Sequence, residues 1–256
     1  MSLVALCSVT GSPGVTTTAL AMGWVWPVVT GRRVVVLDAD PAGSGLLPGY
    51  LRGAVPPGGG VLRLAAQQGA PSAQGVLEHC TAWDDDHTRL LLVGVTASVE
   101  ARALGGLWHA IVDLVPDLDR MGVDLVADVG RLEHVFEPTI LLEHAGSAVV
   151  VTRPTLGGVL AATAGLARLR DLRGPVRSTS ALSVGDHRPY SAAEVRSELG
   201  LDRLPVLAWD PRAAERLHSG EYPGRGPLTR SRLLSSAGPV ADALRPAILD
   251  LAGGSR

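Results

Sequence analysis

The sequence predicts a single α/β domain in which a doubly wound, mainly parallel sheet of about seven strands is covered by helices. Short apolar runs rich in β-branched residues alternate along the chain with longer runs of helical character, which is typical of a parallel sheet with helices on both faces. A Gly-rich segment, Thr10–Thr18, joins the first apolar run to the first helical run. Aspartates follow two of the apolar runs, at the sheet edge where this class of fold binds its ligands.

The predicted strands are short and apolar, as buried parallel strands are. They cover Leu3–Ser8, Arg33–Leu37, Arg89–Gly94, Val123–Ala127, Ala148–Thr152, Ala181–Val184 and Pro205–Ala208. Helices are expected in the segments between them, where the apolar spacing is helical. They cover Thr16–Val28, Ala103–Val115, Pro138–His144, Leu156–Leu172, Ala192–Leu199 and Pro211–His218.

Two further regions complete the chain. Residues from about 48 to 71 are rich in glycine and proline, and we expect a long surface excursion there. A last helical region is expected over about 228–251, with a break near Gly238 and Pro239. Because no internal repeat and no linker is evident, one domain is predicted over residues 1–256.

Composition and charge exclude several classes of protein. The chain is 46% apolar and 19% charged with a formal net charge of −2, so no basic excess indicates a nucleic-acid-binding protein. Cys7 and Cys80 fit no metal or redox spacing and predict buried thiols in a reducing compartment. The uncharged N-terminal segment is interrupted by Gly11, Pro13 and Gly14, so we expect no membrane insertion and a cytoplasmic location.

The segment Thr10–Thr18 predicts a phosphate-binding loop, in which backbone N–H groups and a helix N-terminus contact the anion. In a complete P-loop a lysine follows the last glycine and holds the β- and γ-phosphates. Here that residue is Val15, in a chain whose basic residues are all arginine, so the charge has been lost rather than exchanged. The residues expected to contact the phosphates are Gly11, Ser12, Pro13, Gly14, Val15, Thr16 and Thr17.

Three aspartates are predicted to lie beside this loop. Asp38 and Asp40 follow the second strand, and Asp128 ends the strand that begins at Val123, where a Walker-B-like aspartate holds magnesium through water. A single strand-terminal aspartate is equally consistent with a turn or a helix cap. The loop and both acidic segments, in this order and spacing, predict a nucleotide and metal site.

These motifs resemble those of the ParA/MinD family of deviant-Walker-A P-loop ATPases, which partition plasmids and chromosomes and position division sites and pili. The family loop has the sequence Lys-Gly-Gly-x-Gly-Lys-Thr-Thr, which here is replaced by Thr-Gly-Ser-Pro-Gly-Val-Thr-Thr over residues 10–17. Ala148–Pro154 is similar to the family's fifth strand, and Leu204–Arg212 to the strand and turn that border the base. Pro189–Ser191 and Asp210–Arg212 look most like the CpaE/TadZ branch that localises pili and septa.

The resemblance implies a site for ATP or ADP with Mg²⁺. The base would be bordered by Asp210 and Pro211, and Asp40 would position the attacking water if the site is active. The metal would be held through Thr16, Asp38 and Asp128. Protein partners and a homodimer are also implied. Thr10, however, replaces the lysine that reaches across the family's ATP-bridged dimer, so we expect a monomer or a nucleotide-independent dimer.

The missing lysines leave three hypotheses open. The first is a nucleotide-binding switch that binds Mg-ATP or ADP weakly and hydrolyses little or none of it. The second is a pseudo-ATPase scaffold that acts through protein partners alone. The third is a competent ATPase in which Arg153 or Arg131 supplies the missing charge.

A basic cluster near the end of the helix Leu156–Leu172 could serve two purposes. Its members are Arg168, Arg170, Arg173 and Arg177. Cations at a helix C-terminus are favoured by the helix dipole, and we prefer this explanation. The alternative is a surface for non-specific DNA binding, which the resemblance to family members that bind DNA allows and which would show a strong salt dependence.

Overall fold

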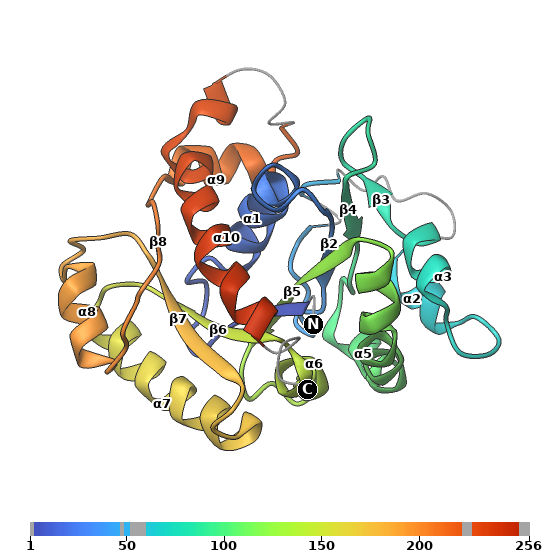
Figure 1. The fold of residues 1–256 in the computed structure, drawn as a ribbon, viewed down its shortest axis with the longest axis horizontal. Coiled ribbons are helices and arrows are strands. Elements are labelled where there is room, and N and C mark those ends of the chain that lie inside the picture. The colour runs from blue at the N-terminus through green and yellow to red at the C-terminus, as the bar shows by residue number, and fades with distance from the viewer. Residues whose placement is uncertain (1–2, 47–48, 52–59, 222–226, 251–256) are drawn as a thin grey trace.

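The computed structural model describes residues 3–46, 49–51, 60–221 and 227–250 of the 256-residue chain. Within this part, one sheet contains the strands β1 (Leu3–Ser8), β2 (Arg33–Asp38), β3 (Thr81–Ala82), β4 (Arg89–Leu92), β5 (Val123–Arg131), β6 (Ser147–Thr152), β7 (Ser178–Val184) and β8 (Val206–Leu207). Their order across the sheet is β3-β4-β2-β5-β1-β6-β7-β8, which Figure 1 shows from one side of the molecule to the other.

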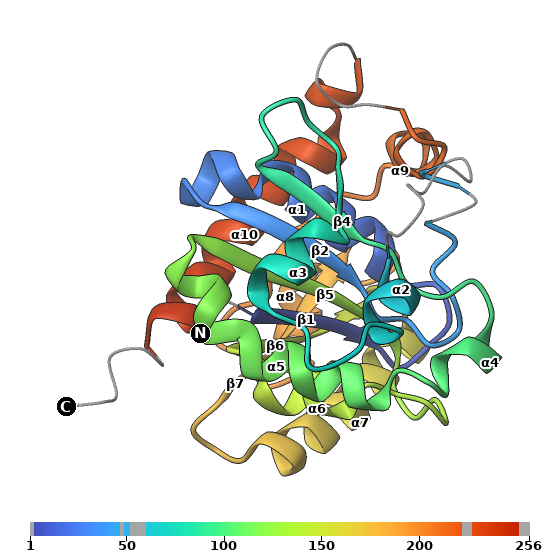
Figure 2. The same cartoon turned by 90° about the vertical axis from the view of Figure 1, so that its right-hand side faces the viewer.

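Helices connect these strands. They are α1 (Val15–Thr30), α2 (Val61–Ala65), α3 (Ala73–Glu78), α4 (Ser98–Ala101), α5 (Gly105–Arg120), α6 (Thr139–His144), α7 (Leu156–Arg173), α8 (Ala192–Glu198), α9 (Pro211–His218) and α10 (Arg232–Asp250), with a 3₁₀ turn, η1 (Pro227–Arg230). In Figures 1 and 2, α5, α6 and α7 lie on one side of the sheet and α1 and α10 on the other, so the predicted doubly wound fold is confirmed. In the described part of the chain, no helix combines the length and the apolar sequence needed to cross a membrane.

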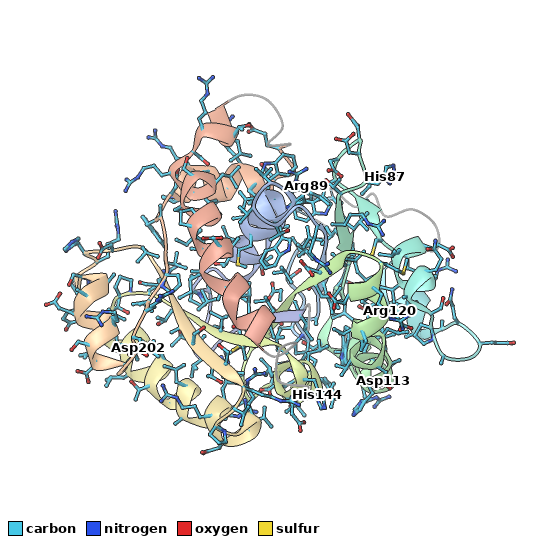
Figure 3. All side chains as sticks on the ribbon, in the orientation of Figure 1. His87, Arg89, Asp113, Arg120, His144 and Asp202 are labelled. Carbon is cyan, nitrogen blue, oxygen red and sulfur yellow. The ribbon has the colours of Figure 1, made fainter. Side chains whose placement is uncertain are left out.

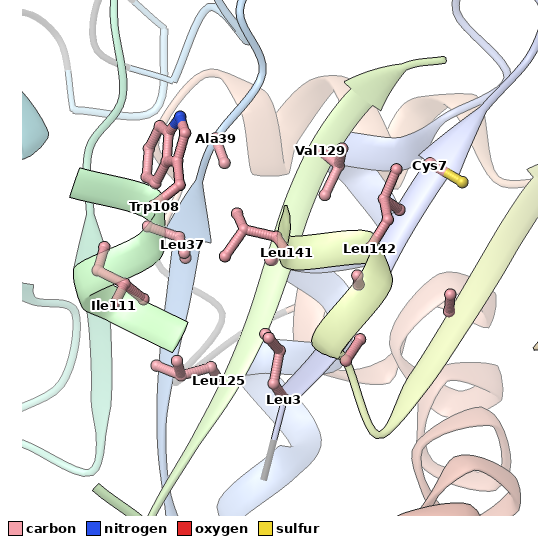
Figure 4. Packing of buried hydrophobic residues seen from close by; sticks show 14 of the residues in the cluster. Leu3, Cys7, Leu37, Ala39, Trp108, Ile111, Leu125, Val129, Leu141 and Leu142 are labelled. Atoms are coloured by element: carbon pink, nitrogen blue, oxygen red, sulfur yellow. The ribbon is translucent and has the colours of Figure 1, made fainter. Parts of the chain in front are cut away.

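Strand alternation divides the core into two layers. In β1, Leu3, Ala5 and Cys7 belong to the cluster beneath α5, α6 and α7, whereas Val4 and Leu6 belong to the cluster beneath α1 and α10. This is the two-residue period of a strand whose two faces are both buried. Figure 4 shows the first layer, in which side chains of α5 and α6 pack on those of β1, β2 and β5.

The chain order across the sheet reverses at β1. The chain passes from β1 outward to β2 on one side of the sheet and later from β6 to β8 on the other, so β1 lies between β5 and β6. In open α/β sheets this reversal creates a crevice at the carboxyl ends of the strands. The segment that follows β1 is the Gly-rich loop, so the topology places it in the crevice.

The fold differs from the sequence prediction in several places, among them the short helices α3 and α4, which were not predicted. An eighth strand, β3, forms an antiparallel edge beside β4. Part of the predicted surface excursion forms α2, in which Val61 and Leu64 are buried; residues 48 and 52–59 of that excursion lie outside the described residues. The expected break at Gly238 and Pro239 was wrong, because α10 is continuous there and packs closely along α1.

Candidate functional site

The loop after β1 has an unusual backbone conformation. Ser12 has a φ of 55° and Gly14 a φ of 110°, and glycine is favoured at the second of these because it has no Cβ. A non-glycine residue in the left-handed region is a local strain of the kind found at ligand-binding loops. Gly14 is the N-cap of α1, so the loop presents the N-terminus of a 16-residue helix to the crevice.

A cavity of about 480 Å³ lies in front of this helix N-terminus. The predicted residues Gly11, Ser12, Pro13, Gly14, Val15, Thr16 and Thr17 all line it, together with Thr10. Asp40 and Ser44 from the segment after β2, Gly130 and Arg131 from β5, Arg153 after β6 and His218 of α9 complete the wall. The structure therefore gathers the predicted loop residues and Asp40 around one opening.

Asp38 and Asp128 lie behind this wall. They are paired residues on the neighbouring strands β2 and β5, and both are buried. Thr16 Oγ1 donates to Asp128 Oδ2 at 2.5 Å, and Ser44 Oγ donates to Asp38 Oδ2 at 2.7 Å. The two acids are thus held by hydroxyls that line the cavity and are not themselves exposed to it.

Burial also shifts the protonation of these acids. Burial raises the pKa of Asp38 to about 7, against the opposing hydrogen bonds from Ser44 and the Gly94 amide. It raises the pKa of Asp128 to about 8, with the nearby carboxylate of Asp38 acting in the same direction. Near neutral pH the pair therefore retains protons until a cation or another charge arrives.

Two glycines make room for the acids. A Cβ on Gly94 would lie 2.9 Å from Asp38 Oδ1 and 2.5 Å from the Asp38 carbonyl oxygen. A Cβ on Gly130 would lie 2.3 Å from Asp40 Oδ1, and the φ of Gly130 is 73°. The carboxylates of Asp38 and Asp40 therefore occupy the space that side chains would take at positions 94 and 130.

Arginines lie where the loop has lost its lysines. Arg153 donates from Nη2 to the carbonyl oxygen of Ser12 at 2.8 Å, and its guanidinium lies 4.6 Å from the ring centre of Trp209. It is fixed against the loop, over the opening of the cavity. Arg131 is exposed at the wall, and its side chain makes no ion pair or hydrogen bond to the residues described. Two cations therefore remain near the expected phosphates, without either lysine.

Asp210 and Pro211 line a second, smaller cavity of about 180 Å³ beside the first. The two cavities share Pro13, Gly14, Thr17 and Arg153. Asp210 is the N-cap of α9, and its Oδ1 accepts a hydrogen bond from the Ala213 amide at 3.1 Å. The residues predicted to border a base are therefore adjacent to the phosphate loop, next to the indole of Trp209.

His218 is a site residue that the sequence analysis missed. Its Nε2 lies 2.8 Å from Thr17 Oγ1, within hydrogen-bonding distance, and burial lowers the pKa of its imidazole. The two residues are 201 positions apart, and no spacing in the sequence connects them. Ser44, which contacts Asp38, was missed for a similar reason, because it lies in a Gly-rich turn without a recognisable motif.

The basic cluster after α7 is largely used inside the molecule. Arg168 forms an ion pair with Glu137 at 2.7 Å. Buried Arg173 donates to the carbonyl oxygens of Leu142, Ala145 and Ser178, and Arg177 donates to that of Glu143. Arg173 and Arg177 therefore satisfy carbonyls near the C-terminus of α6 rather than those at the end of α7. This use of the cluster weakens the case for a DNA-binding surface.

The predicted metal ligands form an incomplete set. In the described residues, no three His, Cys, Asp or Glu side chains are grouped closely enough to hold a metal ion. Oδ1 of Asp38 is buried without a hydrogen-bond partner among those residues, and hydroxyl and carboxylate oxygens are the donors that Mg²⁺ prefers. The donor types fit Mg²⁺, but oxygens from a bound phosphate are needed to complete its coordination.

Comparison with known proteins identifies the fold but no family. The sequence matches no family model and no curated protein sequence. Among solved structures, a ParA family ATPase from Chlorobium tepidum TLS is 13% identical and superposes with a TM-score of 0.76 over 94% of this chain and 97% of that one. The MinD cell division ATPase of Pyrococcus furiosus is 14% identical, with a TM-score of 0.74 over 96% and 99%.

A third structure has the same fold with a different activity. Cobyrinic acid a,c-diamide synthase from Mycobacterium smegmatis, solved with an ATP analogue and magnesium, is 22% identical and has a TM-score of 0.61 over 100% of this chain and 97% of that one. The chain therefore has the P-loop fold of the ParA/MinD ATPases, as predicted. Because a synthase shares the fold, the activity must be argued from the site.

Proposed function

We propose that this protein is a ParA/MinD-like nucleotide-binding switch that takes part in subcellular positioning or assembly and hydrolyses ATP slowly or not at all. The observation that carries the proposal is the preserved loop: a left-handed turn, a helix N-terminus and a cavity of about 480 Å³, with Val15 in place of the lysine. Backbone amides and a helix dipole provide much of the phosphate affinity of such loops. Arg131 and Arg153 provide positive charge at the opening.

Weak turnover follows from the same residues. A cation placed on the transferring phosphate contributes roughly 10³–10⁵ in rate in phosphoryl transfer. Val15 is only 6% exposed and belongs to the core cluster beneath α1 and α10, and its aliphatic side chain offers no charge to a phosphate. Asp40 lines the cavity and remains the candidate for positioning water, while Thr16 and the two buried aspartates would hold Mg²⁺, which neutralises phosphate charge when bound.

A pseudo-ATPase scaffold is the second candidate, and one observation favours it. The hydroxyls expected to meet the metal and the α-phosphate already have protein partners, because Thr16 bonds to Asp128 and Thr17 contacts His218. Nucleotide binding requires these contacts to open. In a scaffold they would stay closed, and the protein would act through its partners alone. On either hypothesis we propose a cytoplasmic protein with protein partners, as a monomer or a nucleotide-independent dimer.

Titration calorimetry with Mg-ATP and Mg-ADP distinguishes the nucleotide-binding switch from the pseudo-ATPase scaffold. Three proteins are compared: the wild type, the double variant Thr10→Lys with Val15→Lys, and the matched double variant Thr10→Lys with Val15→Met. Methionine has a length similar to that of lysine but carries no charge. We expect wild-type dissociation constants of roughly 1–100 μM, and tighter binding only when residue 15 is lysine. No binding to the wild type, with binding restored by lysine, would establish the scaffold. Equal affinities for lysine and methionine would refute the charge argument.

Turnover is measured next, as phosphate release under saturating Mg-ATP. The proposal predicts slow phosphate release, or none above background, in the wild type. Loss of any residual activity in Arg153→Ala or Arg131→Ala would instead support a competent ATPase with a substitute cation.

A further inference from the structure

The contact between His218 and Thr17 joins two helices at the wall of the candidate nucleotide cavity. Thr17 lies in the first turn of α1, and His218 is the last residue of α9, which packs beside α1 (Figure 1). Both side chains are half-buried, and both line the cavity of about 480 Å³. Unlike the buried Asp38 and Asp128, this pair is therefore directly open to a ligand in the cavity.

In the structure the two side chains satisfy each other. His218 Nε2 lies 2.8 Å from Thr17 Oγ1, and neither side chain has another hydrogen bond or an ion pair to the residues described. Burial lowers the pKa of the imidazole, so the ring is uncharged near neutral pH and has one nitrogen that donates and one that accepts. The pair therefore has hydrogen-bonding capacity left for a ligand.

A phosphate at Thr17 would change the roles within this pair. Phosphate oxygens accept hydrogen bonds, so the Thr17 hydroxyl must direct its hydrogen at the phosphate and no longer at the imidazole. With its hydrogen on Nε2, His218 is a second donor, 2.8 Å from the first and on the same cavity wall. Because a phosphate has several acceptor oxygens, both donors can bind the same one. One neutral hydrogen bond is then replaced by two stronger bonds to a charged group.

The position of the pair indicates which phosphate it meets. Thr17 lines both the main cavity and the smaller one that Asp210 and Pro211 border, so it lies where the expected phosphate and base regions meet. In a nucleotide, the phosphate next to the nucleoside is the α-phosphate. The lysine that Val15 replaces would hold the β- and γ-phosphates, so its loss leaves this donor pair intact.

We propose that His218 is a phosphate-binding residue: it and Thr17 exchange their mutual hydrogen bond for hydrogen bonds to the α-phosphate of a bound nucleotide. The inference rests on the proposed nucleotide-binding function and adds to it a ligand from α9, outside the loop and the acidic segments. Bound nucleotide then links α9 to α1 through its α-phosphate. A loop without lysines thereby keeps a side-chain contact that ADP and ATP make equally.

The test is titration calorimetry with Mg-ADP and Mg-ATP on single variants. His218→Leu removes the donor, His218→Gln keeps an amide N–H donor without a titratable ring, and His109→Leu, at an exposed position on α5, is the matched control. We expect His218→Leu to weaken both nucleotides about tenfold or more, and by the same factor, because ADP and ATP share the α-phosphate. His218→Gln should stay within about threefold of the wild type, and His109→Leu should bind as the wild type does.

Sulfur substitution then identifies the phosphate that is bound. In ADPαS, sulfur replaces one α-phosphate oxygen, and sulfur is the weaker hydrogen-bond acceptor. We expect one of the two isomers to bind the wild type about threefold or more weakly than ADP does, and to lose this difference in His218→Leu. The substituted oxygen of that isomer is then the one that His218 contacts.

Four results would overturn the inference: unchanged affinity in His218→Leu, a loss for ATP alone, equal losses in His218→Leu and His218→Gln, or sulfur effects that His218→Leu leaves unchanged. Tighter binding by His218→Leu would also overturn it, because the contact with Thr17 would then only block the site. A wild type that binds no nucleotide contradicts the proposed function instead. The same substitutions are then measured in the double variant Thr10→Lys with Val15→Lys, where the same results decide, and no binding there would overturn both proposals.

Discussion

The buried carboxyls of Asp38 and Asp128 predict that the protein is most stable on the acid side of neutrality. Burial raises the pKa of Asp38 to about 7 and that of Asp128 to about 8, from an ordinary value of 3.8. Between about pH 5 and 7, the folded protein therefore holds protons that the unfolded chain has already lost. Unfolding releases these protons, so the free energy of unfolding falls as the pH rises.

The magnitude follows from the number of protons. Each retained proton lowers the free energy of unfolding by about 1.4 kcal/mol per pH unit, so one to two carboxyls give a slope of roughly 1.4–2.7 kcal/mol per unit. The loss continues until the pH passes the folded pKa values, near 8. Burial also raises the pKa of Asp124, which adds to the trend in the same direction at lower pH.

The assay is urea unfolding, followed by circular dichroism at about pH 5, 6, 7 and 8 in the presence of EDTA. Asp128→Asn and Asp38→Asn should each flatten the slope by about 1.4 kcal/mol per unit and stabilise the protein most at the highest pH. Asp113→Asn, at an exposed position on α5 labelled in Figure 3, should leave the slope unchanged. Wild-type stability that rises between pH 5 and 7, or asparagine variants with the wild-type slope, would refute the reasoning.

Two further predictions concern stability, and each has a matched control measured in the same denaturation assay. Gly130→Ala should cost about 1–3 kcal/mol more than Gly122→Ala, because both glycines have left-handed φ values, 73° and 72°, but only the first meets a neighbour, Asp40. Equal costs would show that the Asp40 contact is absent. Arg173→Met should destabilise by about 2–4 kcal/mol, since it leaves buried carbonyls without donors, whereas the exposed Arg170→Met should change stability by less than about 0.5 kcal/mol.

The sheet was predictable because its strands are buried on both faces. Seven apolar runs were long enough to be recognised, and the structure has strands at all seven. The eighth, Thr81–Ala82, has two residues and no periodicity, and α2, α3 and α4 contain at most six residues each, too few for a helical pattern to emerge. Local sequence patterns also do not predict the order of the strands across the sheet.

Tertiary packing explains the error in the last helix. Gly238 and Pro239 predict a break, but a Cβ on Gly238 would lie only 4.0 Å from Val29 of α1. Ala237 and Val240, on either side, are buried against the same helix. Burial of this face outweighs the low helix propensity of the two residues.

The candidate site was predictable where a motif or a strand end marks its residues. Gly11–Thr17 form one segment whose glycines, threonines and flanking runs indicate a phosphate loop, and the structure places them around one cavity. Contacts made across the chain were missed. His218 meets Thr17 through a crossing of elements that no local motif encodes. Arg153 was expected near the phosphates, but its contacts with Ser12 and Trp209 were not predicted.

The close fit of glycines and carboxylates has a consequence for how such a protein could lose its activity. Asp38 and Asp40 fill space that Gly94 and Gly130 leave open, so the acids are packing elements as well as candidate catalytic groups. Replacing either acid with a smaller side chain would leave a void beside a glycine, so their packing role favours side chains of this size whether or not the site hydrolyses ATP. The presence of the acids is therefore no measure of turnover. The residue at position 15 is the more direct indicator of what the site does, because a lysine there would contact the transferring phosphate.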